Sequence, residues 1–101
     1  MLAEGGRLVY RDGQDSTAEI FDISVDEGYR RRGVGRSLVD RLFAEFRSVF
    51  AFTRETNDGA KRFYRALGFT EARVPGFYRG MDSLFFHRSS DAGIVSVDPL
   101  R

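Results

Sequence analysis

The stretch that decides the fold is TAEIFDISVDEGYRRRGVGRSLVDRLFAEF, residues 17–46. Residues 17–25 are rich in β-branched and aromatic side chains, which predicts a β-strand. Regular alternation would divide its side chains between two faces, with Glu19, Phe21, Ile23 and Val25 on one and Ile20, Asp22 and Ser24 on the other. Further along, apolar residues recur at the spacing of one helical face and predict a helix that begins near Val34: Leu38, Val39, Leu42, Phe43 and Phe46.

The residues between this strand and this helix combine glycines with arginines. A helix N-terminus has unpaired N–H groups and about half a positive charge, and Gly33 and Gly35 have no β-carbons to keep an anion away from them. Four arginines add full charges: Arg30, Arg31, Arg32 and Arg36. The pattern suits a phosphate or pyrophosphate site, and a plain turn with solvated arginines explains the same residues equally well. It is neither a P-loop nor a dinucleotide motif, because no Lys-Ser/Thr pair follows and Leu38 replaces the third glycine.

The sequence on either side of this strand, turn and helix predicts two more strands and a second helix. Glycine-containing turn signals bracket a short strand over residues 7–11, and residues 49–53 (VFAFT) fit a buried strand. Asn57 or Asp58 can cap the second helix, which Gly68 ends. Its apolar face consists of Ala60, Phe63, Tyr64 and Leu67.

The C-terminal third predicts a hairpin of two strands, residues 69–74 and 83–87, joined by a turn at Pro75-Gly76. Residues 94–97 are predicted to form either an additional strand or a frayed end of the chain. Strands that alternate with helices, with a hairpin on each flank, indicate an α/β (α+β) fold with a mixed sheet.

The composition narrows the classes of function. A chain of 101 residues, 42% of them hydrophobic, suits one domain over residues 1–101, with a core over 7–88 and a tail or extra strand over 89–101. With no cysteine and one histidine, no metal site is expected. No apolar run approaches about 18 residues, and the N-terminal residues lack the charged and then apolar pattern of a signal peptide. We therefore expect no membrane association and a cytoplasmic location. A net charge of +1 argues against nucleic acid as a partner.

Tyr64 falls on the apolar side of the second predicted helix. It can be a core aromatic whose hydroxyl has a backbone partner. It can also be a general acid, since a phenol with a pKa of ~10 can protonate a departing thiolate. Spacing alone does not choose between these roles.

Two segments resemble the motifs of one enzyme family. Residues 30–35 (RRRGVG) resemble the R/Q-x-x-G-x-G/A acyl-CoA motif of the GNAT N-acetyltransferase superfamily. Residues 57–69 (NDGAKRFYRALGF) resemble its N-x-x-A-x-x-x-Y-x-x-x-G-F segment, and the resemblance extends over residues 7–87. Residues 74–88 more loosely resemble the last hairpin of the branch that acetylates protein N-termini, such as the ribosomal-protein alanine N-acetyltransferases.

The resemblance implies a GNAT-like mixed sheet and an N-acetyltransferase that uses acetyl-CoA as co-substrate and no metal. Tyr64 would protonate the departing sulfur after direct attack of an amine on the thioester. The strand over 17–25 and its parallel neighbour would splay apart to admit the pantetheine arm. The implied acetyl-CoA contacts are Ile23, Ser24, Val25, Arg30, Arg31, Arg32, Gly33, Val34, Gly35, Arg36, Ser37 and Asn57.

The resemblance leaves the catalytic base open. Members that act on N-terminal alanine have a glutamate where this chain has Phe52. Histone-type members have a glutamate that matches Glu19 in its offset from the glycine motif, so Glu19 is the candidate base. Asp22 is a second candidate on the other predicted face of that strand. Glu55 fits a loop charge, and His87 fits a structural imidazole.

Family members usually begin with a strand and two helices that form one wall of the acceptor pocket, whereas this sequence starts almost at the following hairpin. We therefore expect a fold that lacks those elements and a homodimer, with residues 94–97 as an exchanged or added strand. A non-catalytic acyl-CoA-binding or regulatory module is the alternative function. The acceptor, a small-molecule or protein amine, is not specified by these residues.

Overall fold

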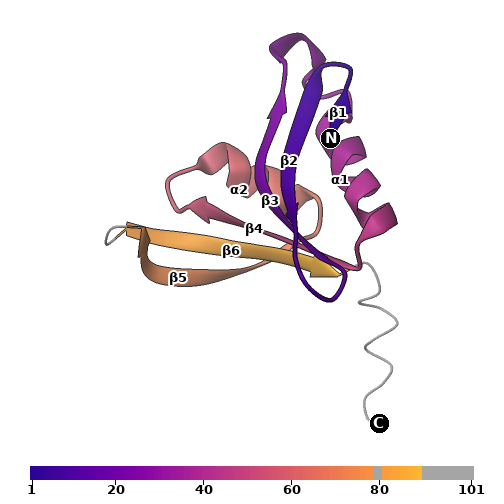
Figure 1. Cartoon of the computed structure of the whole chain (residues 1–101). Coiled ribbons are helices and arrows are strands. Elements are labelled where there is room, and N and C mark those ends of the chain that lie inside the picture. The colour runs from indigo at the N-terminus through magenta and orange to yellow at the C-terminus, as the bar shows by residue number, and fades with distance from the viewer. Residues whose placement is uncertain (79–80, 90–101) are drawn as a thin grey trace.

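The computed structural model describes residues 1–78 and 81–89, whose strands form one sheet in the order β1-β2-β3-β4-β6-β5 (Figure 1). β3 and β4 are parallel, and the other neighbouring pairs are antiparallel. The mixed sheet expected from the sequence is therefore confirmed. In chain order the elements are β1 (Leu2–Ala3), β2 (Gly6–Asp12), β3 (Thr17–Val25), the 3-10 helix η1 (Glu27–Tyr29), α1 (Val34–Glu45), β4 (Ser48–Arg54), α2 (Asp58–Ala66), β5 (Thr70–Tyr78) and β6 (Met81–Ser89).

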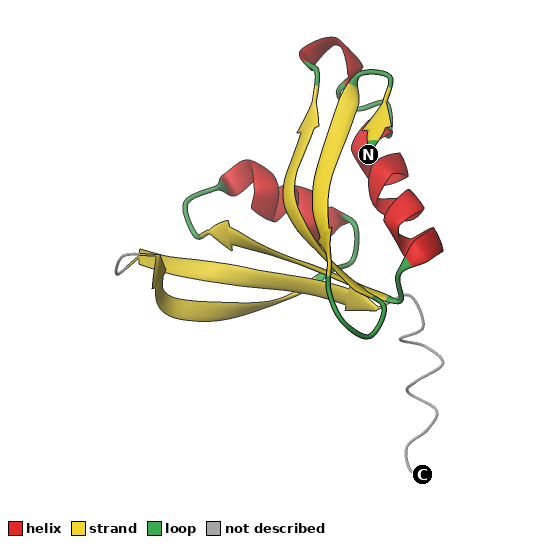
Figure 2. Ribbon diagram, viewed as in Figure 1, coloured by secondary structure: helices red, strands yellow, loops and turns green. Residues whose placement is uncertain are grey.

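Both α-helices pack on the same face of the sheet, α1 against β1–β3 and α2 behind β4 (Figure 2). One apolar cluster fills the space between them and the strands, and its fully buried members include Leu8, Leu38, Leu42, Val49 and Phe86. Among the described residues, neither α1 nor α2 has the length and apolar character that crossing a membrane requires.

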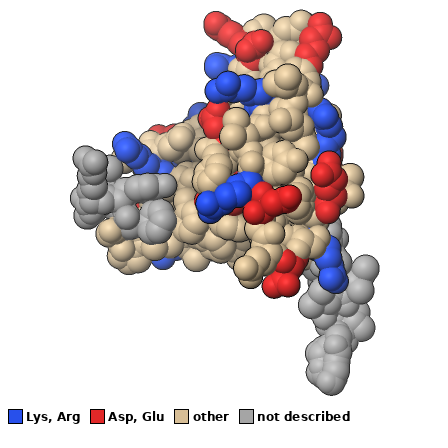
Figure 3. Space-filling view, in the orientation of Figure 1, with Lys and Arg blue, Asp and Glu red and all other residues tan. Residues whose placement is uncertain are grey.

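We call the other side of the sheet the open face. Aromatic rings gather there on β4 and β6, where Phe52 lies 5.1 Å and Phe50 5.6 Å from Phe85 between ring centroids. Charged side chains of β2 occupy its other half, Arg7 and Arg11 both being exposed. Figure 3 shows basic and acidic side chains at the upper end and a largely uncharged surface over the lower strands.

A β-bulge interrupts β3 at Phe21. Tyr10 of β2 pairs with Ile20, whereas its neighbour Val9 pairs with Asp22. Phe21 is therefore an extra residue that has no pairing partner in β2. Its side chain is 55% exposed. A bulge of this kind shifts the side chains that follow it to the opposite face.

The predicted division of β3 into two faces is consequently wrong beyond the bulge. Ile23, which alternation places beside Glu19, instead packs against the core under the helices. Asp22 lies on the same face as Glu19, and each carboxylate contacts an arginine of β2. Alternation fails because the extra residue reverses the phase of the strand.

The predicted end of β5 at Pro75-Gly76 is also wrong, because β5 continues to Tyr78. The pairing with β6 shifts between Val74 and Tyr78, so Pro75-Gly76 forms an irregularity inside the strand. β5 is an edge strand, where a proline without an N–H is tolerated. Gly76 has φ 66° and donates its amide hydrogen to Asp82 Oδ1 at 3.0 Å, a bond that lowers the pKa of Asp82. Residues 94–97 lie outside the described residues.

Candidate functional site

The two parallel strands diverge and open a cleft between them. Their pairing runs from Thr17↔Ser48 to Ile20↔Ala51, after which Figure 1 shows β3 and β4 separating. The cleft has a volume of about 580 Å³ and is lined from β3, β4 and α2 by Ile20, Phe21, Asp22, Ile23, Val25, Phe52, Thr53, Arg54, Asn57, Gly59, Ala60, Phe63 and Tyr64. Beyond Ile20, no strand of the described residues pairs with the β3 edge that faces β4, which leaves room there for an extended ligand. The divergence of these two strands, which the family resemblance implies, is present.

The glycine–arginine turn lies at the end of β3, next to this cleft. α1 begins at Val34 behind Gly33, which caps it with φ 78°, in the left-handed region that glycine adopts readily. No side chain caps these amides and no acidic residue lies in the first turn of α1. The helix start is therefore available to an anion, and its dipole favours one.

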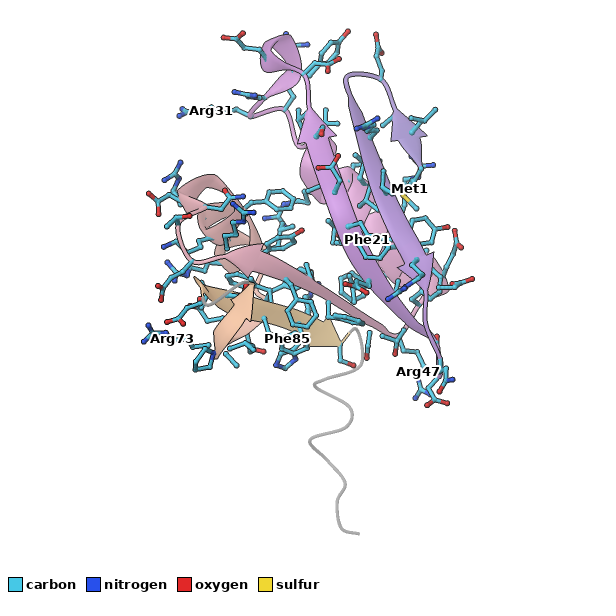
Figure 4. The ribbon with its side chains drawn as sticks, turned by 60° about the vertical axis from the view of Figure 1, so that its left-hand side comes forward. Met1, Phe21, Arg31, Arg47, Arg73 and Phe85 are labelled. Carbon is cyan, nitrogen blue, oxygen red and sulfur yellow. The ribbon has the colours of Figure 1, made fainter. Side chains whose placement is uncertain are left out.

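The arginines of this turn are exposed, and one of them connects the turn to the cleft. Arg30 donates from Nε to the carbonyl oxygen of Val25 at 3.3 Å, and Val25 lines the cleft. Arg32 lies over the ring of Tyr29 at 5.4 Å. Figure 4 shows Arg31 extending outward from the turn on the side where α2 lies. The turn thus places positive charge at the end of the cleft.

Gly35 has a different role from the one that its place in the motif suggested. A β-carbon there would lie 2.8 Å from Cε1 of Phe63, whereas a β-carbon at Gly33 would meet no atom within 4 Å. Gly35 is buried, so its missing side chain makes room for the Phe63 ring of α2. Only Gly33 leaves open space at the helix start. At Gly35 the missing side chain therefore makes room for Phe63 and not, as predicted from the sequence, for an anion.

Tyr64 contributes to the core and to the cleft at once. Its ring is buried, stacks on Phe86 at a centroid distance of 5.3 Å and meets Phe69 edge-on at 5.2 Å. It also belongs to the cleft lining. Burial, and to a smaller extent the negative charge of Asp22, raise the pKa of Tyr64 above its usual value. The phenol is therefore held in its protonated form, which is the form that can donate a proton.

Asn57 is the N-cap of α2, and it also lines the cleft. Its Oδ1 accepts a hydrogen bond from the amide of Ala60 at 3.0 Å. This resolves the choice between Asn57 and Asp58 that the sequence left open. The cap fixes the start of the helix that carries Tyr64.

We expect Asn57→Ala to lower the free energy of unfolding by about 1 kcal/mol, since it removes the acceptor for an otherwise unpaired amide. Asn57→Asp, which keeps an oxygen at the same place, should remain close to the parent. Urea denaturation of the three chains measures the difference. Equal stability of the alanine and aspartate variants would show that the cap contributes nothing.

The candidate bases lie in different surroundings. Glu19 Oε1 accepts from Arg11 Nη2 at 2.9 Å and does not belong to the cleft lining, whereas Asp22 does. Glu55 pairs with Arg73 at 3.3 Å in the loop after β4. His87 lies on β6, where its Nε2 is 2.7 Å from Thr70 Oγ1.

The structure thus brings together part of the predicted site. Ile23, Val25, Asn57 and Tyr64 line one cleft, with the glycine–arginine turn at its end. The place of Phe21 in the cleft lining and the side of β3 on which Asp22 lies were not predicted from the sequence. No local signal in residues 17–25 marks the bulge, because it is defined by pairing with β2.

Comparison with known proteins gives consistent matches. The model of the acetyltransferase (GNAT) family matches residues 5–69, more than half of the chain. The chain is 36% identical over 62 residues to the ribosomal protein bS18-alanine N-acetyltransferase of Escherichia coli K12, a match that covers 56% of this chain and 42% of that protein. This chain therefore spans less than half the length of that curated relative.

Solved structures show the same fold. Ard1 from Thermoplasma volcanium superimposes with a TM-score of 0.68 at 32% identity, over 83% of this chain and 62% of that one. Arabidopsis thaliana NAA60 in complex with acetyl-CoA gives a TM-score of 0.64 at 26% identity, over 78% and 51% of the two chains.

Proposed function

This chain belongs to the acetyltransferase (GNAT) family, and we propose on that basis that it transfers an acetyl group from acetyl-CoA to a primary amine. The observation that carries the proposal is the cleft between β3 and β4. A helix start suited to phosphate lies at its end, and a buried, protonated tyrosine lies in its wall.

We assign the acetyl-CoA contacts to three parts of the site. The first turn of α1, from Gly33 to Ser37, and the arginines before it suit the pyrophosphate, because amides and guanidinium groups donate to phosphate oxygens. The edge of β3 from Ile23 to Val25 suits the pantetheine arm, because beyond Ile20 this edge does not pair with β4 and a ligand can bond to its backbone as a strand does. The carbonyl oxygen of Val25 also accepts a hydrogen bond from Arg30. Asn57 lines the same cleft from the start of α2.

The proposed reaction is direct acyl transfer. A neutral amine attacks the thioester carbonyl, and the C–S bond breaks when the tetrahedral intermediate collapses. Tyr64 gives its proton to the departing sulfur. Holding the amine and the thioester in one cleft supplies much of the rate, because the step becomes effectively intramolecular. The sequence predicts Glu19 as the base that deprotonates the amine, whereas Glu19 lies outside the cleft lining.

We carry three further expectations as parts of this proposal. The acceptor is an amine on a small molecule or on a protein, in keeping with the relative that acts on ribosomal protein bS18. A homodimer and a cytoplasmic location follow from the sequence argument alone. The alternative of a non-catalytic acyl-CoA-binding module fits the same cleft and differs only in turnover.

Two measurements test the function. Titration calorimetry with acetyl-CoA should give saturable binding, and the presence of acetyl-CoA should raise the Tm. A screen of primary amines, including peptides that begin with alanine, should then show thiol release that depends on both substrates. Binding without thiol release for any amine would favour the non-catalytic module. No binding at all would contradict both functions.

The arginine turn gives a second prediction. Arg31→Gln combined with Arg36→Gln should weaken acetyl-CoA binding about tenfold, a loss of ~1.4 kcal/mol, since two cations beside a pyrophosphate are removed. Arg65→Gln is the control, because Arg65 of α2 does not line the cleft and bonds instead to Glu71 of β5 at 2.6 and 2.8 Å. Calorimetry compares the dissociation constants. An equal loss in the Arg65 variant would indicate a general charge effect.

A further inference from the structure

We propose that Asp22 is the carboxylate that receives the ammonium group of the acceptor and takes up its proton. This inference rests on the proposed function. It comes from the β3 bulge, which moves Asp22 to the open face at the level where β4 has already diverged. Among the described residues that line the cleft, Asp22 alone carries a carboxylate.

The surroundings of Asp22 leave it accessible. Ser24 Oγ donates to its Oδ2 at 3.2 Å and Arg7 Nη2 donates to the same oxygen at 3.3 Å, so Oδ1 is the oxygen left for a ligand. Its side chain is 49% exposed. An ammonium can therefore reach Asp22, and solvent can carry a proton away from it.

Asp22 also lies within electrostatic range of Tyr64. The two residues share the cleft lining from β3 and α2, and the charge of Asp22 acts on the titration of Tyr64. Arg54 of β4 is the other charged residue of this lining, and Arg7 approaches from β2. The amine and the sulfur are bound to the same carbon in the tetrahedral intermediate. A base for the amine must therefore lie near the acid for the sulfur, as Asp22 does.

Glu19 meets these requirements less well. It lies opposite Phe50 in the part where β3 and β4 are still paired, below the point of divergence. Its side chain is 14% exposed and its carboxylate contacts Arg11. An amine that reacts inside the cleft would have to be deprotonated from outside it.

The protons balance with Asp22 in this role. The ammonium gives one proton to Asp22, which passes it to solvent, and the neutral amine attacks. The nitrogen then loses a second proton to water, and the sulfur takes a proton from Tyr64, which solvent restores. In total an ammonium and acetyl-CoA give an amide, a free thiol and one proton.

The test uses the acceptor that turns over fastest in the amine screen. Asp22→Asn should lower kcat/KM at least tenfold at pH 7, and its rate should recover as the pH rises towards the pKa of the amine, since the free amine then needs no base. Acetyl-CoA affinity should stay within threefold, because asparagine keeps an acceptor for Ser24. Asp40→Asn, an exposed aspartate of α1, is the matched control and should retain parent activity.

Three results would overturn the inference. One is an Asp22→Asn variant with parent activity and an unchanged pH profile. Another is a loss with this pH signature in Glu19→Gln but not in Asp22→Asn, which would identify Glu19 as the base. The third is the same loss in Arg7→Gln, which would show that the ion pair shapes β3 and that the carboxylate is structural. If the parent chain binds acetyl-CoA but acetylates no amine, the proposed function itself fails.

Discussion

Replacing Tyr64 by phenylalanine is expected to lower kcat about 100-fold while acetyl-CoA affinity changes less than threefold, because a general acid contributes ~10²–10⁴ in rate. The ring is buried and stacked on Phe86, and phenylalanine keeps that packing. The variant therefore removes the hydroxyl and little else. Steady-state thiol release and calorimetry measure the two effects separately.

The matched control is Tyr10→Phe. Tyr10 packs edge-on against Phe46 at 5.8 Å and lies outside the cleft lining, so its hydroxyl should be dispensable for turnover. A Tyr64→Phe chain that keeps full kcat would assign the proton donation to water. A Tyr64→Phe chain that loses acetyl-CoA affinity in proportion to kcat would make Tyr64 a binding residue.

The raised pKa of Tyr64 adds a prediction with a definite sign. Since the folded-state pKa lies above the ordinary ~10, Tyr64 stays protonated up to pH 10 and beyond. The rate of the parent should therefore show no alkaline decline between pH 8 and 10 from loss of the acid. The same shift favours the folded state below the unfolded pKa, and that contribution is lost as pH rises above about 10. Tyr64→Phe should lack this alkaline loss of stability.

The elements predicted from the sequence are those with local causes. Residues 17–25 form β3 as predicted, because β-branched and aromatic residues suit an extended chain. α1 begins at Val34 since glycine permits the left-handed turn before it, and α2 begins after an asparagine that can cap it. Each signal lies within a few residues of the feature that it predicts.

The errors arise where partners distant in sequence decide the outcome. The bulge at Phe21 depends on how β3 meets Tyr10 and Val9 of β2, and the continuation of β5 past Pro75 depends on pairing with β6. The place of Glu19 beside Arg11 is likewise a cross-strand contact. Which carboxylate reaches the cleft therefore could not be predicted from spacing along the chain.

The second large effect concerns Gly35, where we expect Gly35→Val to lower the free energy of unfolding by about 2 kcal/mol, in the range of ~1–3 kcal/mol for overpacking. A β-carbon at this position would lie 2.8 Å from Cε1 of Phe63, and valine adds two methyl groups beyond it. Valine forms helices better than glycine by ~0.3 kcal/mol, which is too little to offset the clash. Urea denaturation measures the difference.

The double variant separates the clash from other effects of Gly35→Val. With Phe63→Ala the ring is gone, so the two substitutions together should cost at least about 1 kcal/mol less than their sum, as expected of residues in contact. Gly28→Val is the control, because a β-carbon there meets no atom within 4 Å, and it should leave stability nearly unchanged. Phe63 also lines the cleft, so a ring displaced by the introduced valine would narrow the cleft and weaken acetyl-CoA binding. Additive costs with normal affinity would instead mean that α1 and α2 can move apart freely, and that Gly35 belongs to the motif for its backbone amide alone.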